Sequence, residues 1–373
     1  MPQTTETQGP LGHGQSDRTA DRSGASRVGR TLAAAYPGLV CDLDGVVYRG
    51  AQPVPHAVDE LTKAQHNGSR VVYATNNASR PPAIVAESLR GFGVRLDDAD
   101  VLTSSMAGAG HLAHQLPAGA AVLAIGGPGV TEALEAAGLR PVAAADAAKT
   151  PVEAVLQGYG AGVTAAELGE AAYAIQGGAR WVATNNDLTL PTDRGVAPGN
   201  GSLVAAVQLA VGIEPTVVGK PGPMLYELAA EALGTGPDST LGIGDRLETD
   251  TAGAHAAGMD ALHVLTGVHG PADLVRAPRG MRPRFIGVDL RVLDEAYAEP
   301  APAGNGRWMA AGWAGTLVGQ GNSARVSFEA GGAADADLAW VAKLRLALPV
   351  LWQALDQGLI TDAEAVAALP EPQ

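Results

Sequence analysis

Two acidic residues, with one residue between them, follow the first apolar run of the chain. The run at 39–41 leads into Asp42 and Asp44, and Gly45 permits the sharp turn that the chain needs there. Two carboxylates just past a strand end can both reach the crevice where parallel sheets bind ligands. Because like charges so close together repel, the pair favours a divalent cation beside it. On this motif alone, a solvated turn and a site are equally good interpretations.

Hydrogen-bond donors suited to an anion follow a second apolar run, at residues 70–74. Thr75, Asn76 and Asn77 supply a hydroxyl, two side-chain amides and the N–H groups of a turn. The structural alternative is an Asx turn before a helix, which uses the same residue types.

The position of Lys220 also favours an anion site. It is one of only four lysines, and a Pro-Gly-Pro segment at an expected helix start follows it. A cation beside a helix N-terminus opposes the helix dipole and usually costs stability. A phosphate bound there would contact the ammonium group and the N-terminal amides together.

More carboxylates follow a third apolar run, at residues 240–243. Asp245 would add a hard oxygen ligand for a divalent cation. Asp250 lies five residues later and could orient Lys220 or a metal-bound water.

These residues belong to a pattern in which apolar runs alternate with helical stretches from about residue 36 to residue 293. The apolar runs lie at 39–41, 70–74, 121–125, 154–158, 181–183, 240–243 and 261–265. The helical stretches lie at 54–66, 81–91, 131–137, 164–175, 221–233 and 249–257. Unbroken apolar runs are typical of parallel strands, which are buried on both faces. We therefore expect α/β units around mostly parallel sheets.

The ordered set of Asp42, Asp44, Thr75, Lys220 and Asp245 resembles the four motifs of the haloacid dehalogenase (HAD) superfamily of phosphohydrolases. The segments DLDGVVYRG, ATNNAS, VVGKPGP and GDRLETDTAGAHAAGM are similar to subfamily IIA, the NagD-like, 4-nitrophenyl, phosphoglycolate and glycerol 3-phosphate phosphatases. The resemblance covers about residues 36–293. Response-regulator receivers also use acids, a threonine and a lysine, but in a different chain order.

The resemblance implies a Mg²⁺-dependent hydrolysis of small phosphomonoesters. Asp42 would attack phosphorus and form an aspartyl-phosphate. Asp44 would protonate the leaving alkoxide and then deprotonate the attacking water. The metal ligands would be the Asp42 carboxylate, the Asp44 backbone carbonyl and Asp245. Asp250 would be a second-layer residue that orients Lys220 or a metal-bound water.

The resemblance also assigns the phosphate-binding groups. Lys220, Thr75 and the amides around Asn76 and Asn77 would neutralise the phosphoryl oxygens, which is the main task in phosphoryl transfer. Asp187, in the segment 187–194, would contact the alcohol side of the substrate. The alternative for Asp187 is a structural turn network.

The implied fold class is α/β, with a Rossmann-like HAD core on a parallel sheet, an inserted α/β cap domain and a small C-terminal α+β module. The insert is too long for a loop. We expect a disordered tail at 1–30, core segments at 31–104 and 200–295, the cap at 105–199, a linker at 296–306 and the module at 307–373.

The C-terminal module has its own composition. It holds four of the five tryptophans, and residues 337–357 predict an amphipathic helix followed by a capping box at Thr361–Glu364. The module resembles the short acetyltransferase-like (GNAT-like) extension of some actinobacterial phosphatases of this subfamily. It is too short for a complete acetyltransferase, so we expect a regulatory or dimerising role and a possible homodimer.

Composition excludes several kinds of partner. The 373 residues carry a net charge of −14 and no basic cluster, which argues against nucleic acid and anionic membrane surfaces as partners. No apolar run is long enough for a membrane span, and the first 30 residues lack the apolar stretch of a signal peptide. The single cysteine, Cys41, fits a cytoplasmic location.

Two other functions stay open at this point. The scaffold would also suit a nucleotide or pyridoxal-phosphate phosphatase, although the segment 187–194 has no aromatic residue to stack on a base. A metabolite-binding regulator is the alternative from another class, and the complete set of Asp42, Asp44, Lys220 and Asp245 argues against it.

Overall fold

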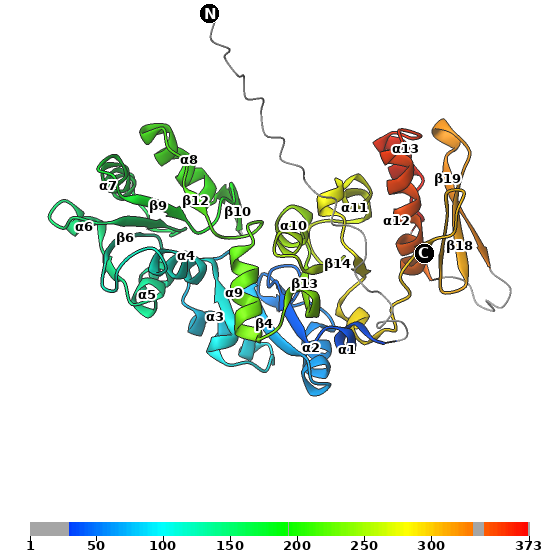
Figure 1. The fold of residues 1–373 in the computed structure, drawn as a ribbon, viewed down its shortest axis with the longest axis horizontal. Coiled ribbons are helices and arrows are strands. Elements are labelled where there is room, and N and C mark those ends of the chain that lie inside the picture. The colour runs from blue at the N-terminus through cyan, green and yellow to red at the C-terminus, as the bar shows by residue number, and fades with distance from the viewer. Residues whose placement is uncertain (1–29, 193, 331–338, 372–373) are drawn as a thin grey trace, which may run out of the picture.

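The computed structural model describes residues 30–192, 194–330 and 339–371. Apart from Arg30, the expected tail therefore lies outside the described residues. Two α/β units and a C-terminal module follow one another along the longest axis of the molecule (Figure 1).

The first unit is built on a six-stranded sheet with the order β15-β14-β13-β1-β4-β5, in which all neighbouring strands are parallel. Its strands are β1 (Gly38–Cys41), β4 (Arg70–Thr75), β5 (Val101–Thr103), β13 (Thr240–Gly244), β14 (Asp260–Val264) and β15 (Phe285–Gly287). Alternate residues of β1 pack into two different cores, Leu39 and Cys41 into one and Val40 into the other. Burial on both faces explains why these strands are unbroken apolar runs.

Helices cover both faces of this sheet. One face packs against α1 (Leu32–Ala35), α2 (Ala57–His66) and α3 (Pro82–Gly91). The other packs against α4 (Ser104–Ala113), α9 (Met224–Leu233) and α10 (Ala252–Ala256). A short π-helical turn, η4 (Leu247–Thr251), leads into α10.

A second parallel sheet has the order β12-β9-β8-β6-β7. Its strands are β6 (Ala121–Ile125), β7 (Arg140–Val142), β8 (Ala154–Gln157), β9 (Arg180–Ala183) and β12 (Thr216–Val217). The helices of this unit are α5 (Pro128–Ala136), α6 (Ala144–Ala147), α7 (Ala165–Gln176) and α8 (Asn200–Val211). A hairpin of β10 (Thr189–Thr192) and β11 (Gly195–Pro198) precedes α8.

The second unit extends past residue 200, the expected boundary of the cap, and includes α8 and β12. Strand β12 pairs with β9, and Val204 and Val207 of α8 pack in the core of the second sheet with Trp181. A helix whose apolar side faces one sheet belongs to that sheet, and the sequence pattern does not say which sheet this is.

The C-terminal module is a four-stranded antiparallel sheet covered on one side by a long helix. It consists of β16 (Ala301–Pro302), β17 (Arg307–Ala310), β18 (Trp313–Val318), β19 (Arg325–Ala330), α12 (Trp340–Asp356) and α13 (Asp362–Ala367). The capping box at Thr361 and Glu364 is confirmed. The expected linker at 296–306 is not free chain, because β16 pairs with β17 at the sheet edge, where proline is tolerated.

The strand predictions are confirmed for all seven apolar runs, whereas the three-residue strands β5, β7 and β15 were not predicted. Helix α9 begins at Met224, so Lys220 lies in the loop before it and not at the helix start. Among the described residues, no helix combines the length and apolarity that crossing a membrane would need.

Candidate active site

Sheet order brings three of the predicted motifs together. Strands β13, β1 and β4 are neighbours, and their carboxyl ends carry Asp245, Asp42 and Thr75 respectively. Because all three strands are parallel, these residues emerge at the same sheet edge. Positions 75 and 245, far apart in the sequence, thus flank Asp42.

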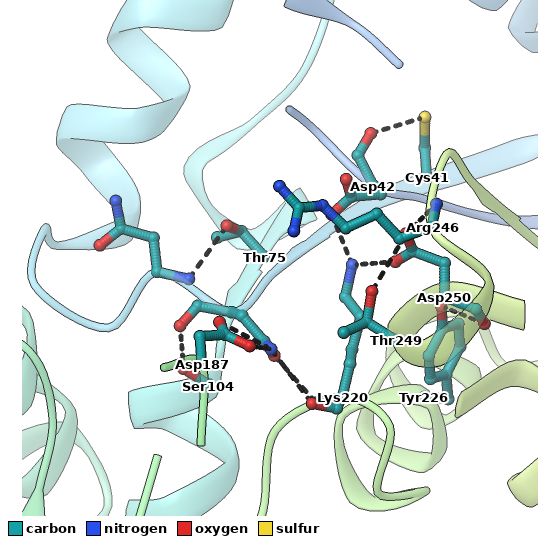
Figure 2. Close-up of polar contacts among 12 residues, drawn as sticks. Cys41, Asp42, Thr75, Ser104, Asp187, Lys220, Tyr226, Arg246, Thr249 and Asp250 are labelled. Carbon is teal, nitrogen blue, oxygen red and sulfur yellow. Dashed lines mark hydrogen bonds and ion pairs between the residues drawn. The ribbon is translucent and has the colours of Figure 1, made fainter. Parts of the chain in front are cut away.

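Lys220 lies between two carboxylates (Figure 2). Its Nζ donates to Asp42 Oδ1 at 2.5 Å and to Asp250 Oδ1 at 2.8 Å. The lysine side chain is only 3% exposed, and that of Asp250 only 4%. The loop before α9 therefore places the buried Lys220 ammonium group at the end of β1, where the Asp42 and Asp250 carboxylates compensate its charge.

Electrostatics keep Lys220 charged. Burial alone would lower its pKa, but Asp250 and Asp42 together raise the pKa well above its usual value. Burial raises the pKa of Asp42, and Asp250 and Asp245 raise it further, while Lys220 opposes them. The Lys220 ammonium group is thus surrounded by the carboxylates of Asp42, Asp245 and Asp250. When all four groups are ionised, their net charge is negative.

Asp250 uses both carboxylate oxygens inside the protein. Oδ1 accepts from Lys220, and Oδ2 accepts from the backbone N–H of Arg246 at 3.1 Å. Its carbonyl accepts from the buried hydroxyl of Tyr226 at 3.0 Å. These contacts favour the predicted supporting role of Asp250 over that of a metal ligand.

Asp245 has the properties of a metal ligand. Its Oδ2 accepts from the N–H of Val268 at 2.7 Å, but its Oδ1 is buried without a hydrogen-bond partner. Burial and the nearby Asp250 raise its pKa to about 6. One oxygen from each of Asp42, Asp245 and Asp250 lies within 4.8 Å of the other two. An unpartnered oxygen among carboxylates fits a hard divalent cation, which would also lower these raised pKa values.

Asp44 lies at the mouth of the site, where its side chain is exposed. The surrounding protein still desolvates the carboxyl enough to raise its pKa, and Arg80, Arg246 and Lys220 oppose that increase. The hydroxyl of Tyr48 hydrogen-bonds to it. A carboxyl with a raised pKa in reach of solvent suits the predicted general acid.

Thr75 and Asn77 form a turn with each other. The N–H of Asn77 donates to Thr75 Oγ1 at 3.1 Å, and Asn77 Oδ1 accepts from the N–H and hydroxyl of Ser79 at 3.0 and 2.8 Å. The Asx turn left open by the sequence therefore exists. The hydroxyl hydrogen of Thr75 can still point to an anion, whereas Oδ1 and the backbone N–H of Asn77 are engaged in the turn.

The hydrogen bonds of the Asn76 side chain argue against a phosphate-binding role for it. Its Oδ1 accepts from the N–H of Lys220 at 2.8 Å, and its Nδ2 donates to the Lys220 carbonyl at 3.1 Å. The same Nδ2 donates to Asp187 Oδ2 at 3.2 Å. Its carbonyl accepts from Ser104 Oγ and Asn185 Nδ2, each at 2.7 Å. Asn76 thus joins the first sheet, the second sheet and the lysine loop.

Asp187 belongs to the second unit and contacts Asn76 beside the site. Its Oδ2 accepts a hydrogen bond from the Asn76 amide at 3.2 Å. Burial raises its pKa, and the hydrogen bond from Asn76 opposes the increase. Its place next to the phosphate-binding motif agrees with both readings of the sequence, a substrate contact and a turn network.

Sequence reasoning missed two arginines at the mouth of the site. Both Arg80 and Arg246 oppose the raised pKa of Asp44. Arg246 directly follows Asp245, and Arg80 ends the segment that begins at Thr75. Their places next to two predicted motifs could have indicated them, because an anion site with a single lysine is strengthened by arginines beside it.

Comparison with protein families identifies the chain. Residues 39–140 match the family model described as haloacid dehalogenase-like hydrolase, and residues 217–293 match a HAD-hydrolase-like model. A D-glycerol 3-phosphate phosphatase of Mycobacterium tuberculosis is 44% identical over 267 residues, which are 71% of this chain and 73% of the relative. The chain belongs to the haloacid dehalogenase-like hydrolases. It is a HAD-type phosphatase in fold and in motif order.

Other relatives of this HAD hydrolase are phosphatases named for other substrates. The 5'-nucleotidase YutF of Bacillus subtilis is 36% identical and covers 62% of this chain and 88% of its own length. The solved p-nitrophenyl phosphatase from Archaeoglobus fulgidus has a TM-score of 0.65 and 29% identity, and covers 70% of this chain and 99% of its own.

One solved relative also reaches the C-terminal module. The glycerol phosphate phosphatase from Mycobacterium tuberculosis, solved in complex with magnesium, has a TM-score of 0.75 and 38% identity, and covers 87% of this chain and 93% of its own. A match of this extent necessarily includes part of the C-terminal module. The acetyltransferase-like origin expected for the module stays a prediction.

Proposed function

We propose that this HAD hydrolase removes phosphate from small phosphomonoesters in a Mg²⁺-dependent reaction, with glycerol 3-phosphate as the first substrate candidate and phosphoglycolate as the second. The observation that carries the proposal is Lys220, fixed between Asp42 and Asp250, beside the unpartnered Asp245 Oδ1. The similarity to the mycobacterial D-glycerol 3-phosphate phosphatase supports the choice of substrate.

Asp42 is the proposed nucleophile. Its Oδ1 is held by Lys220, which fixes the direction of the carboxylate at the end of β1. An Asp42 oxygen attacks phosphorus, the new oxygen–phosphorus bond forms, and the bond from phosphorus to the alkoxide breaks. The product of this step is an aspartyl-phosphate and the free alcohol.

Asp44 is the proposed acid and base. Its raised pKa favours the protonated carboxyl that can give a proton to the departing alkoxide. In the second step the Asp44 carboxylate takes a proton from water, whose oxygen attacks phosphorus. The Asp42 carboxylate is then released together with inorganic phosphate.

Lys220 and Thr75 neutralise the phosphoryl oxygens during both steps. Asp42, Asp245 and the backbone carbonyl of Asp44 would hold Mg²⁺, which supplies charge neutralisation at the same oxygens when bound. Asp250 positions Lys220 through its 2.8 Å contact.

The second α/β unit is the proposed cap, and Asp187 is its proposed contact with the leaving group. A carboxylate accepts hydrogen bonds from hydroxyl groups, so it suits a polyol such as glycerol. The described part of the segment 187–194 offers no aromatic side chain for stacking a base. This supports a small polyol phosphate over a nucleotide.

Phosphate release over a panel of phosphomonoesters, with and without Mg²⁺, tests the proposal. The panel contains glycerol 3-phosphate, phosphoglycolate, nucleoside monophosphates, pyridoxal phosphate and sugar phosphates. We expect Mg²⁺-dependent release with the highest kcat/KM for glycerol 3-phosphate. Preference for a nucleotide would replace the substrate assignment, and no release from any ester would overturn the phosphatase proposal.

We also propose a cytoplasmic location and a homodimer, which the sequence predicts. The buried, unpaired Cys41 supports the reducing compartment. Sedimentation of the full chain at several concentrations measures the oligomeric state, and a single monomeric species would contradict the homodimer.

A further inference from the structure

The segment 266–269, between β14 and α11 (Pro271–Arg276), runs directly across Asp245. The N–H of Val268 donates to Asp245 Oδ2 at 2.7 Å, and the N–H of His269 donates to the Asp245 carbonyl at 3.2 Å. The hydroxyl of Thr266 donates to the carbonyl of Gly45 at 2.6 Å. The segment therefore ties the end of β13 to the turn that follows β1.

Two glycines let this segment lie against the carboxylate. A Cβ atom at Gly267 would overlap Asp245 Oδ2, and a Cβ atom at Gly45 would overlap the same oxygen. Gly45 also has a φ of +85°, which side chains disfavour. The Asp245 carboxylate thus occupies a slot formed by two backbones, and its unpartnered Oδ1 is left over for a ligand.

The C-terminal module contacts α11, the helix that follows this segment. Helix α11 starts immediately after it, and the Trp352 indole N–H of α12 donates to the carbonyl of Leu274 in α11 at 2.8 Å. Leu247, two residues after Asp245, is buried in the same apolar cluster as Leu274 and Leu348 of α12. The module therefore packs against the turn after β13 and against the helix that follows residues 266–269.

Further contacts fix α12 on the first unit. Arg345 Nε donates to the carbonyl of Ile286 in β15 at 2.7 Å. Asp356 accepts from Arg282 at 2.7 and 2.8 Å and from Arg279 at 2.9 Å. These polar anchors lie at several places along the helix, so α12 has a defined orientation on the unit that carries the site.

We propose that residues 266–269 are a positioning segment for Asp245, and that the C-terminal module fixes this segment and thereby strengthens binding of the divalent cation. The inference rests on the proposed function only in that Asp245 binds Mg²⁺. It assigns the module a role within this chain, in addition to any contact with a second copy.

Calorimetric titration of the full chain with Mg²⁺, without substrate, tests the link to the module. Trp352→Phe removes the hydrogen bond to Leu274 and keeps an aromatic ring. We expect its Mg²⁺ dissociation constant to rise about fivefold, which corresponds to one hydrogen bond. Trp340→Phe is the matched control, because the Trp340 N–H donates to Pro370 inside the module at 2.9 Å.

Two variants test the segment itself. Gly267→Ala should weaken Mg²⁺ binding more than tenfold, because the added methyl group displaces the Asp245 carboxylate. Thr266→Val keeps the shape of the side chain but cannot donate to Gly45, so we expect an intermediate loss. Thermal unfolding of each variant without Mg²⁺ shows whether it is folded before the titration is interpreted.

A merely stabilising role of the module would lower the unfolding temperature of both tryptophan variants and leave Mg²⁺ affinity unchanged. Equal affinities of folded Trp352→Phe, Trp340→Phe and the unmodified chain would overturn the link to the module. Unchanged affinity in Gly267→Ala would overturn the positioning role of the segment. Mg²⁺ binding without phosphate release from any ester would reject the proposed function and leave this inference standing.

Discussion

Asn76 binds the backbone of Lys220 at two points. Its Oδ1 accepts from the Lys220 N–H at 2.8 Å, and its Nδ2 donates to the Lys220 carbonyl at 3.1 Å. Because the amide also donates to Asp187, one side chain relates the lysine to the second α/β unit. The position of the Lys220 ammonium group between Asp42 and Asp250 therefore depends on Asn76. Asn76 follows β4 of the first sheet, whereas Lys220 follows β12 of the second.

We predict that Asn76→Ala lowers kcat about 100-fold, because a shift of the lysine backbone misplaces the ammonium group. Asn76→Asp should fail as well, since a carboxylate cannot donate to the Lys220 carbonyl or to Asp187. Steady-state kinetics provide the measurement. Asn67→Ala on the exposed end of α2 is the control. A kcat within twofold of the unmodified enzyme for Asn76→Ala would show that Lys220 keeps its place without this contact.

Replacing Lys220 should affect both stability and activity. Lys220→Met leaves Asp42 and Asp250 buried without their cation, which costs about 3–5 kcal/mol of unfolding free energy without Mg²⁺. Urea unfolding measures this loss, and added Mg²⁺ should reduce it. We expect kcat to fall about 1,000-fold, and a fall of less than tenfold would argue against a role of the ammonium group in phosphoryl transfer.

Asp42→Asn should lower kcat at least about 1,000-fold, because the amide is a poor nucleophile. Acid quenching with a ³²P-labelled ester should leave label on the unmodified enzyme and none on the variant. Retained activity at the normal rate would refute the nucleophile assignment.

Mg²⁺ binding should weaken as pH falls through about 6. The pKa of Asp245 is raised to about 6, and a proton on this carboxyl competes with the metal. We expect a constant dissociation constant above about pH 7 and a loss approaching tenfold per pH unit below about 6. Asp245→Asn should bind Mg²⁺ more weakly and with a flatter pH profile. Calorimetry between pH 5 and pH 8 gives both curves.

The same carboxyl predicts the pH dependence of stability without metal. Its folded-state pKa lies above the unfolded value, so the folded protein binds the proton more tightly and metal-free stability falls as pH rises from about 4 to 6. Saturating Mg²⁺ should remove this decline, because the bound metal stabilises the ionised form. A decline of the same size in Asp245→Asn would assign it to another group.

Asp187→Asn should change substrate choice more than chemistry. We expect a higher KM for glycerol 3-phosphate and a smaller change for 4-nitrophenyl phosphate, whose leaving group has no hydroxyl to donate. Kinetics on both esters measure the ratio of kcat/KM. Equal losses on the two esters would identify Asp187 as a structural partner of Asn76.

The sequence by itself determined much of this protein. Parallel strands are buried on both faces, so the runs that became β1, β4 and β13 were readable as strands, and the residues at their carboxyl ends as a site. Asp42, Thr75 and Asp245 were selected in this way, Lys220 by its place before an expected helix and Asp250 by its place after Asp245, and the structure brings them together. The resemblance to HAD hydrolases, carried by the same residues, is confirmed by the family matches.

Tertiary structure decided what depends on contacts between distant segments. The sequence could not show that the Asn76 amide turns to Lys220, that β12 pairs with β9, or that α12 packs beside the turn after Asp245. Local patterns report which side of an element is apolar and which residue types are available. They do not report which partner is met there, because the partner is chosen by packing between elements that are distant in the sequence.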